Sequence, residues 1–328
     1  MWCERGDSNP HALRRWILSP VRLPIPPPSL SADSKTFDPS ILLAPASSLV
    51  PRLGMAIDHY ENFPVGSVLL PRRLRHPTAV IYAFARSADD IADEGDDPPP
   101  VRLERLRHYH GQLQRIAAGE MPTEALFDAL AQITRQHDLP PQLFYDLIDA
   151  FSQDVVKKRY ADYSELLDYC RRSANPIGRL MLRLFQRDNE RNCADADRIC
   201  TSLQLINFWQ DVAIDHKKGR IYLPQDEMSQ HGVTAAQIER GDCSGGWRSL
   251  MAAQIERTRA LLFAGAPLAA RLGGRFGLEI RLTIEGGRRI LELIEASGGD
   301  VFRHRPQLRL RDWLLMLARS QRALPEST

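Results

Sequence analysis

Six acidic residues crowd into a short stretch of this chain. The stretch ARSADDIADEGDD, residues 85–97, holds six acids and one arginine and directly follows the apolar run TAVIYAF. On a helix, Asp89 and Asp93 are one turn apart, so both carboxylates project from one face, with Arg86 one turn earlier. Two carboxylates at this spacing repel each other unless a cation lies between them. The pattern therefore favours either a cation site or a solvated acidic surface.

A second polar cluster lies within the run LQLINFWQDVAID. Its amides and acids are spaced so that they form one stripe along a helix: Gln204, Asn207, Asp211 and Asp215. The opposite face is apolar and contains Leu205, Phe208, Trp209 and Val212. This arrangement predicts a helix whose polar stripe lines an internal cavity while its apolar side packs outward onto neighbouring helices. A buried row of this kind is costly unless it has a ligand.

Carboxylates and amides without histidine or cysteine are ligands suited to Mg²⁺ rather than Zn²⁺. Magnesium keeps several waters and completes its shell with phosphate oxygens, so two aspartate helices predict a clamp for a diphosphate. Metal ions and arginines in a water-poor pocket stabilise a departing diphosphate. An acidic helix end alone is usually a solvated surface, and the stretch lacks the alternating ligands and the final glutamate of an EF-hand. Taken together, the two clusters favour the metal site.

The composition limits the other function classes. The net formal charge is only +2, and no basic run is interleaved with aromatic residues, so nucleic-acid binding is not expected. The five cysteines are an odd number without a CxxC pair, which predicts reduced thiols in a cytoplasmic protein. No apolar stretch reaches the length of a membrane span.

The elements that position the clusters are predicted to be helices. Residues 1–54 are rich in Pro and Ser and have no apolar period, so we expect them to be disordered and the native start to be Met55. No alternating run is long enough to build a sheet, so the sequence predicts one all-α domain over 55–328. Apolar residues recur with the helical period over 76–94, 102–118, 123–138, 141–158, 164–185, 195–216, 247–271, 275–296 and 306–322.

The two clusters resemble the paired aspartate motifs of the squalene and phytoene synthase family. RSADDIAD is similar to the first motif and QLINFWQDVAID to the second, and the resemblance covers nearly all of 55–328. It implies the isoprenoid synthase fold, a single helical bundle around a central cavity in which the two Asp-rich motifs face each other. It also implies that Mg²⁺ holds the diphosphate of an isoprenoid substrate.

The resemblance assigns roles to individual residues by position. As metal ligands it implies Asp89, Asp93, Asn207, Asp211 and Asp215. As substrate-binding or cavity-lining residues it implies His59, Arg86, Tyr169, Asn175, Gln204, and Arg220 with Tyr222 in the flap GRIYLP.

Departures from the common family pattern indicate a branch of the family. SANPIG stands where the family usually has VAGxVG, which places Pro176 in mid-helix and predicts a bend beside the cavity. Gln210 stands where many condensing members have arginine. These features resemble the bacterial hopanoid-pathway enzyme that converts presqualene diphosphate and water into hydroxysqualene and diphosphate.

Two alternatives stay open. The chain could join two farnesyl diphosphates head to head into presqualene diphosphate or squalene, or it could be a non-catalytic helical protein that binds isoprenoid diphosphates. Because the implied substrate is hydrophobic, we also expect peripheral contact with the inner membrane through the Arg-rich face over 271–311. The alternative is that this face is only solvated. Association with other enzymes of the same pathway is a further expectation.

Overall fold

The computed structural model describes residues 70–303 and 305–320. Over these residues the chain forms helices and no strand, with one isolated bridge between Arg159 and Ile221. The all-α prediction is therefore confirmed. The predicted disordered segment 1–54, the predicted start at Met55 and the predicted substrate-binding residue His59 lie outside the described residues. The helices are α2 (Arg72–Asp93), α3 (Pro99–Ala117), α4 (Ala125–His137), α5 (Pro141–Val156), α6 (Tyr163–Ser173), α7 (Asn175–Leu184), α8 (Glu190–Gln210), α9 (Val212–Lys217), α10 (Gln225–Gln230), α11 (Ala235–Glu239), α12 (Trp247–Gly265), α13 (Pro267–Leu272), α14 (Gly274–Ala296) and α15 (Leu310–Ser320).

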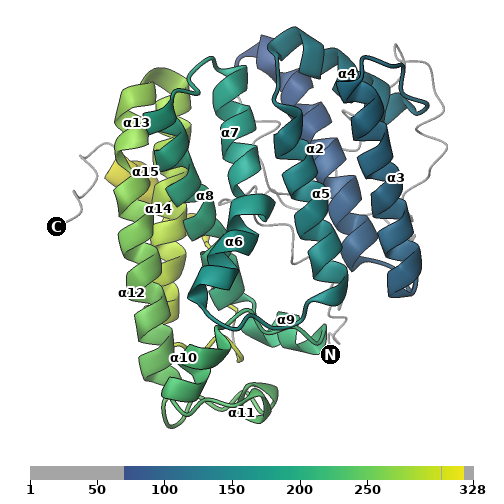
Figure 1. Ribbon diagram of the computed structural model, residues 1–328. Coiled ribbons are helices and arrows are strands. Elements are labelled where there is room, and N and C mark those ends of the chain that lie inside the picture. Colours follow the sequence, from purple (N-terminus) through teal and green to yellow (C-terminus); the bar gives the residue numbers. More distant parts are fainter. Residues whose placement is uncertain (1–69, 304, 321–328) are drawn as a thin grey trace, which may run out of the picture.

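The helices form two groups that meet at α6 and α7 (Figure 1). In one group α2, α3, α4 and α5 pack around Phe84, Phe127 and Phe144. In the other, α8, α12 and α14 pack around Trp209 and Trp247. Helix α7 contributes to both clusters of buried apolar side chains, so it ties the two groups together. This arrangement brings the aspartate stretch at the end of α2 to the same part of the molecule as the end of α8.

Proline positions explain two helix breaks that the periodicity did not predict. The expected helix over 164–185 is two helices, because α6 ends at Ser173 and α7 begins at Asn175. Pro176 therefore lies in the first turn of α7, where its missing N–H has no intrahelical acceptor to lose, and the mid-helix placement was wrong. The expected helix over 247–271 is likewise divided, with Pro267 at the start of α13.

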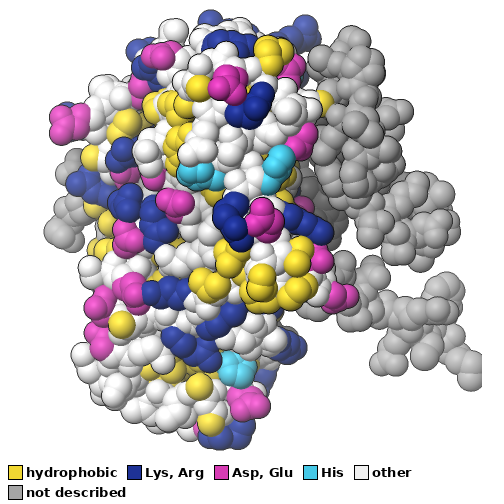
Figure 2. All heavy atoms as spheres, turned by 45° about the vertical axis from the view of Figure 1, so that its right-hand side comes forward, with side chains coloured by type: hydrophobic (Ala, Val, Ile, Leu, Met, Phe, Trp, Pro, Cys, Tyr) yellow, Lys and Arg dark blue, Asp and Glu magenta, His cyan; other side chains and the backbone are white. Residues whose placement is uncertain are grey.

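Charged side chains of both signs are intermixed over the face of the molecule shown in Figure 2. This agrees with the small net charge. None of the described helices has a stretch both apolar and long enough to traverse a bilayer.

A buried carboxyl group on α14 makes stability depend on pH. Glu279 is only 8% exposed, and neither of its carboxylate oxygens has a hydrogen-bond partner. Burial disfavours the charged form and raises the pKa of Glu279 to about 7 from an ordinary value of 4.5. The folded state therefore binds more protons than the unfolded state between these two values. The free energy of unfolding should fall as pH rises through this window, and the loss should be complete above the folded-state pKa.

We expect Glu279→Gln to remove this pH dependence. Glutamine stays neutral, so the variant should match the wild type near pH 5 and be more stable by about 2–3 kcal/mol near pH 8. Urea unfolding at the two pH values measures this. Glu239→Gln, an exposed glutamate on α11, is the matched control and should leave the pH profile unchanged. A Glu279→Gln profile parallel to that of the wild type would contradict the assignment.

Candidate functional site

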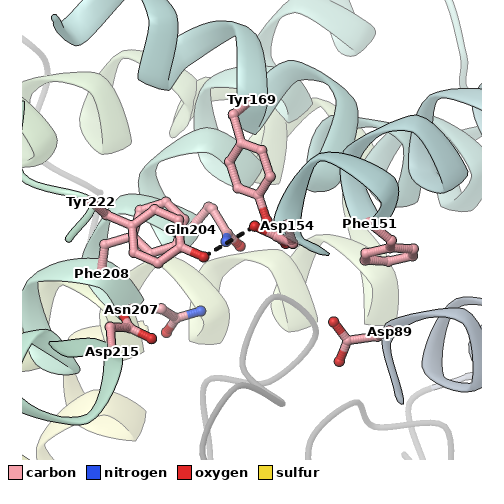
Figure 3. A pocket seen from close by; sticks show the side chains of 9 residues that line it. All are labelled: Asp89, Phe151, Asp154, Tyr169, Gln204, Asn207, Phe208, Asp215 and Tyr222. Carbon is pink, nitrogen blue, oxygen red and sulfur yellow. Dashed lines mark hydrogen bonds between the residues drawn. The ribbon is translucent and has the colours of Figure 1, made fainter. Parts of the chain in front are cut away.

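A pocket that is partly open to solvent lies where the two helix groups meet. Its lining comes from α2, α5, α6, α8, α9 and the segment after α9. Figure 3 shows the lining side chains, which are Asp89, Phe151, Asp154, Tyr169, Gln204, Asn207, Phe208, Asp215 and Tyr222. Six of these nine, all except Phe151, Asp154 and Phe208, are predicted site residues, so the structure brings much of the predicted site together.

The polar groups that could bind a diphosphate lie on two walls of this pocket. Asp89 projects from α2 on one side, and Asn207 with Asp215 lies on the other (Figure 3). Between α8 and the pocket, the Gln204 Oε1 and Asn207 Nδ2 atoms are buried and have no hydrogen-bond partner. Buried polar atoms are almost always paired in folded proteins. Two orphaned amide atoms at one pocket therefore indicate that this pocket binds a polar ligand.

Asp93 does not line the pocket, and its carboxylate pairs with Arg220 of the flap and with Lys218, which directly precedes the flap. Arg220 Nη1 donates to Asp93 Oδ1 at 2.8 Å, and Lys218 Nζ lies 3.5 Å from Asp93 Oδ2. The Arg220 Nη2 atom donates to the backbone carbonyl of Asp154 at 2.8 Å. The buried Arg220 side chain thus links α2 to α5.

Arg86 contacts three other acids of the first cluster. Its guanidinium donates to Asp89 Oδ2 at 3.3 Å and to Glu94 Oε1 at 2.9 Å, and it forms an ion pair with Asp90. Burial alone lowers the pKa of Arg86, but the three neighbouring carboxylates outweigh burial and raise it overall. Arg86 therefore stays charged beside Asp89, where it can face an anionic ligand.

The second cluster is not one straight stripe, and this part of the prediction was wrong. Helix α8 ends at Gln210, and Asp211 has φ −108° and ψ 14°, so the chain turns before α9 begins at Val212. The turn brings Asp215 to the pocket and directs Asp211 to Arg305, whose Nη2 atom donates to Asp211 Oδ2 at 3.2 Å. Gln210 donates to the backbone carbonyl of Pro306 and likewise does not line the pocket.

Phe208 was expected to pack outward but lines the pocket instead. Its ring stacks on Tyr222, with centroids 3.8 Å apart and an interplanar angle of 6°. The adjacent Trp209 does pack outward, where its Nε1 atom donates to Thr258 Oγ1 at 2.9 Å. Successive residues on a helix are only about 100° apart, so Phe208 shares the pocket side with Asn207. The pocket consequently has an aromatic wall beside its polar one.

Asp154 is a pocket residue that the sequence analysis missed. Its buried carboxylate accepts a hydrogen bond from the Tyr222 hydroxyl at 3.2 Å and another from the Tyr169 hydroxyl. A signal was present, because Asp154 falls on the apolar stripe of α5 that includes Leu147 and Phe151. An acid on the buried face of an amphipathic helix needs a partner. The sequence did not show that the partners would be two tyrosines from distant segments.

Asn175, another predicted substrate contact, lies apart from the pocket lining. Its Oδ1 atom accepts from Thr201 Oγ1 at 2.9 Å, which joins the start of α7 to α8.

The donor set of the pocket fits magnesium better than a softer metal. Asp89 and Asp215 offer carboxylate oxygens and Asn207 offers an amide oxygen, and hard divalent cations prefer such ligands. In the part of the chain that the structure describes, no three His, Cys, Asp or Glu side chains come close enough to hold a metal unaided. Carboxylates on opposite walls instead suit ions that keep waters and are shared with phosphate oxygens. The orphaned amide atoms beside them agree with such a shared site.

This chain is similar to several known isoprenoid synthases. A profile described as squalene/phytoene synthase matches residues 57–312. The hydroxysqualene synthase of Rhodopseudomonas palustris is 33% identical over 237 residues, which cover 72% of this chain and 80% of that protein. The phytoene synthase of Mycobacterium tuberculosis is 32% identical over 251 residues, covering 76% and 82%. The solved structure of squalene synthase HpnC from Alicyclobacillus acidocaldarius has a TM-score of 0.71 at 35% identity, and the match covers 77% of this chain and 94% of that one.

Proposed function

The chain belongs to the squalene/phytoene synthase family, and from this premise we propose that it converts presqualene diphosphate and water into hydroxysqualene and diphosphate with Mg²⁺. Membership makes it a head-to-head isoprenoid synthase with the isoprenoid synthase fold. One observation carries the finer proposal: a single pocket joins carboxylates and orphaned amides to an aromatic wall. The similarity of this chain to a protein named hydroxysqualene synthase supports the choice of reaction.

The polar side of the pocket suits the leaving group. Bound Mg²⁺ would supply positive charge to the diphosphate oxygens as the carbon–oxygen bond breaks. Asp89, Asn207 and Asp215 would hold the ions, and Arg86 stands beside Asp89 as a fixed positive charge. Placing these groups before reaction lowers the cost of forming negative charge on the leaving group.

The aromatic side of the pocket suits the cation that remains. The faces of Phe208 and Tyr222 can lie against a carbocation and stabilise it through the ring quadrupole. Asp154 holds the hydroxyl groups of Tyr169 and Tyr222 in fixed positions next to these rings. In the proposed reaction the electron pair leaves with diphosphate, the cyclopropylcarbinyl cation rearranges, and water adds and loses a proton. No reductant is required.

Condensation of two farnesyl diphosphates is the second candidate function. A relative named phytoene synthase is nearly as similar to this chain as the one named hydroxysqualene synthase. The side chain of Gln210 contacts Pro306 rather than the pocket, so its residue type no longer argues against condensation.

Product analysis of the full-length chain tests the proposal. The protein would be incubated with Mg²⁺ and either presqualene diphosphate or farnesyl diphosphate, in separate reactions without NADPH. We expect hydroxysqualene from presqualene diphosphate and no product from farnesyl diphosphate. Presqualene diphosphate formed from farnesyl diphosphate would establish condensation instead, and binding without turnover of either substrate would indicate a non-catalytic protein.

A further inference from the structure

Three leucines are exposed along the outer side of α15. Leu310, Leu314 and Leu317 are 57%, 64% and 47% exposed, and their spacing places them on one side of the helix. The opposite side packs on α14, where Met316 is buried and Asp312 accepts from Arg289 Nε at 2.8 Å. We propose that this leucine face docks on the surface of an anionic lipid bilayer.

The charge around the leucine face favours anionic lipid. Arg309 and Arg311 are exposed beside it, and neither forms an ion pair with any described residue. The only acid within 305–320 is Asp312, which is buried. Acidic and basic side chains are mixed over the face in Figure 2, whereas the exposed charge on this segment is of one sign. Apolar side chains flanked by arginines are typical of helices that lie in the plane of a membrane interface.

Most of the arginines in the broader basic face proposed from the sequence are already neutralised. Arg271 pairs with Asp195, and Arg288 and Arg289 pair with Glu292 on the same helix. The membrane-binding surface that the sequence placed over 271–311 is therefore reduced to the C-terminal end of this range, together with the exposed leucines of α15.

The charge of the leucine face makes a second copy of this chain a poorer binding partner than lipid. A two-fold interface through α15 would bring together two copies of the same segment, and this segment carries the exposed Arg309 and Arg311 but no exposed acid to pair with them. Like charges facing each other in this way oppose association. Lipid headgroups instead offer negative charge above an apolar layer, which matches both features of the face.

The proposed face is connected directly to the second aspartate motif. Arg305 binds Asp211, and the Pro306 carbonyl accepts from Gln210, only a few residues before α15 begins. Docking of α15 would therefore hold the end of α8 close to the bilayer that dissolves a long isoprenoid substrate. Membrane docking through α15 does not depend on which product the enzyme forms.

Vesicle co-sedimentation of the full-length protein, without substrate, tests the proposal. We expect binding to vesicles of phosphatidylcholine mixed with phosphatidylglycerol, weaker binding to phosphatidylcholine alone, and loss of the difference at high salt. The triple variant Leu310→Gln, Leu314→Gln and Leu317→Gln should lower the partition coefficient at least about tenfold. The double variant Arg309→Gln and Arg311→Gln should remove the preference for the anionic vesicles.

A matched control uses exposed apolar residues elsewhere. Val101→Gln with Met121→Gln changes side chains that are 39% and 67% exposed and should leave vesicle binding unchanged. Thermal unfolding of each variant checks that the fold is kept. The proposal is overturned if the wild type does not bind the mixed vesicles, or if the leucine variant binds them as well as the control does. It is also overturned if the wild type is a dimer that the leucine substitutions convert to a monomer.

Discussion

Replacing either Asp89 or Asp215 by alanine is expected to lower kcat by at least about a thousandfold, a loss of about 4 kcal/mol in transition-state stabilisation. The two carboxylates lie on opposite walls of the same pocket. If each holds an ion against the diphosphate, removing one leaves the leaving group without part of its positive charge. Steady-state kinetics with presqualene diphosphate at saturating Mg²⁺ measures the effect.

A matched control separates the pocket from the acidic stretch around it. Asp96 belongs to the same run as Asp89, but it is exposed and does not line the pocket, so Asp96→Ala should keep nearly full activity. Partial recovery of Asp215→Ala at raised Mg²⁺ concentration would support a direct role in ion binding. Turnover of both pocket variants near the wild-type rate would refute the proposed role of the carboxylate walls.

The periodicity of the sequence was sufficient to predict the long helical stretches and one side of the pocket, but not the places where three of these stretches break. Asp89, Gln204 and Asn207 lie on helices long enough for spacing to decide which face they share, and the structure places all three at the pocket. The presence of Asp215 at the pocket was also predicted, but for a reason that the structure does not support. It reaches the pocket because the chain turns at Asp211, whereas the sequence analysis assumed one continuous helix.

The missing parts of the site depend on contacts between segments far apart in the chain. Arg305 meets Asp211 across 94 positions, and Tyr222 meets Asp154 across 68. Helical spacing relates neighbours within a turn or two and has no information on which helix packs beside which. The sequence did show that Asp154 is an acid on an apolar stripe. A charged residue on an otherwise apolar helix face is therefore a useful marker of a site even when the sequence does not show its partners.

Asp154→Asn is expected to lower kcat by about a hundredfold. Asparagine keeps one acceptor oxygen but replaces the other with a donor, so it can accept well from only one of Tyr169 and Tyr222. One tyrosine hydroxyl would then lose its position in the pocket. The lost hydrogen bond should cost about 1–3 kcal/mol in the free energy of unfolding. Asp149→Asn is the matched control, because Asp149 is exposed on the same helix.

The role of Asp154 as a positioning residue requires a readout that a purely structural role would not change. If Asp154 acts by holding the two hydroxyl groups, the kinetic effects of Asp154→Asn and Tyr222→Phe should not add in the double variant. The distribution of products should also shift, because a cation whose surroundings are less ordered has more ways to be quenched. Additive kinetic effects with an unchanged product distribution would mean that Asp154 supports only the fold. Non-additive effects with new products would instead indicate that the buried carboxylate helps to decide where water meets the cation.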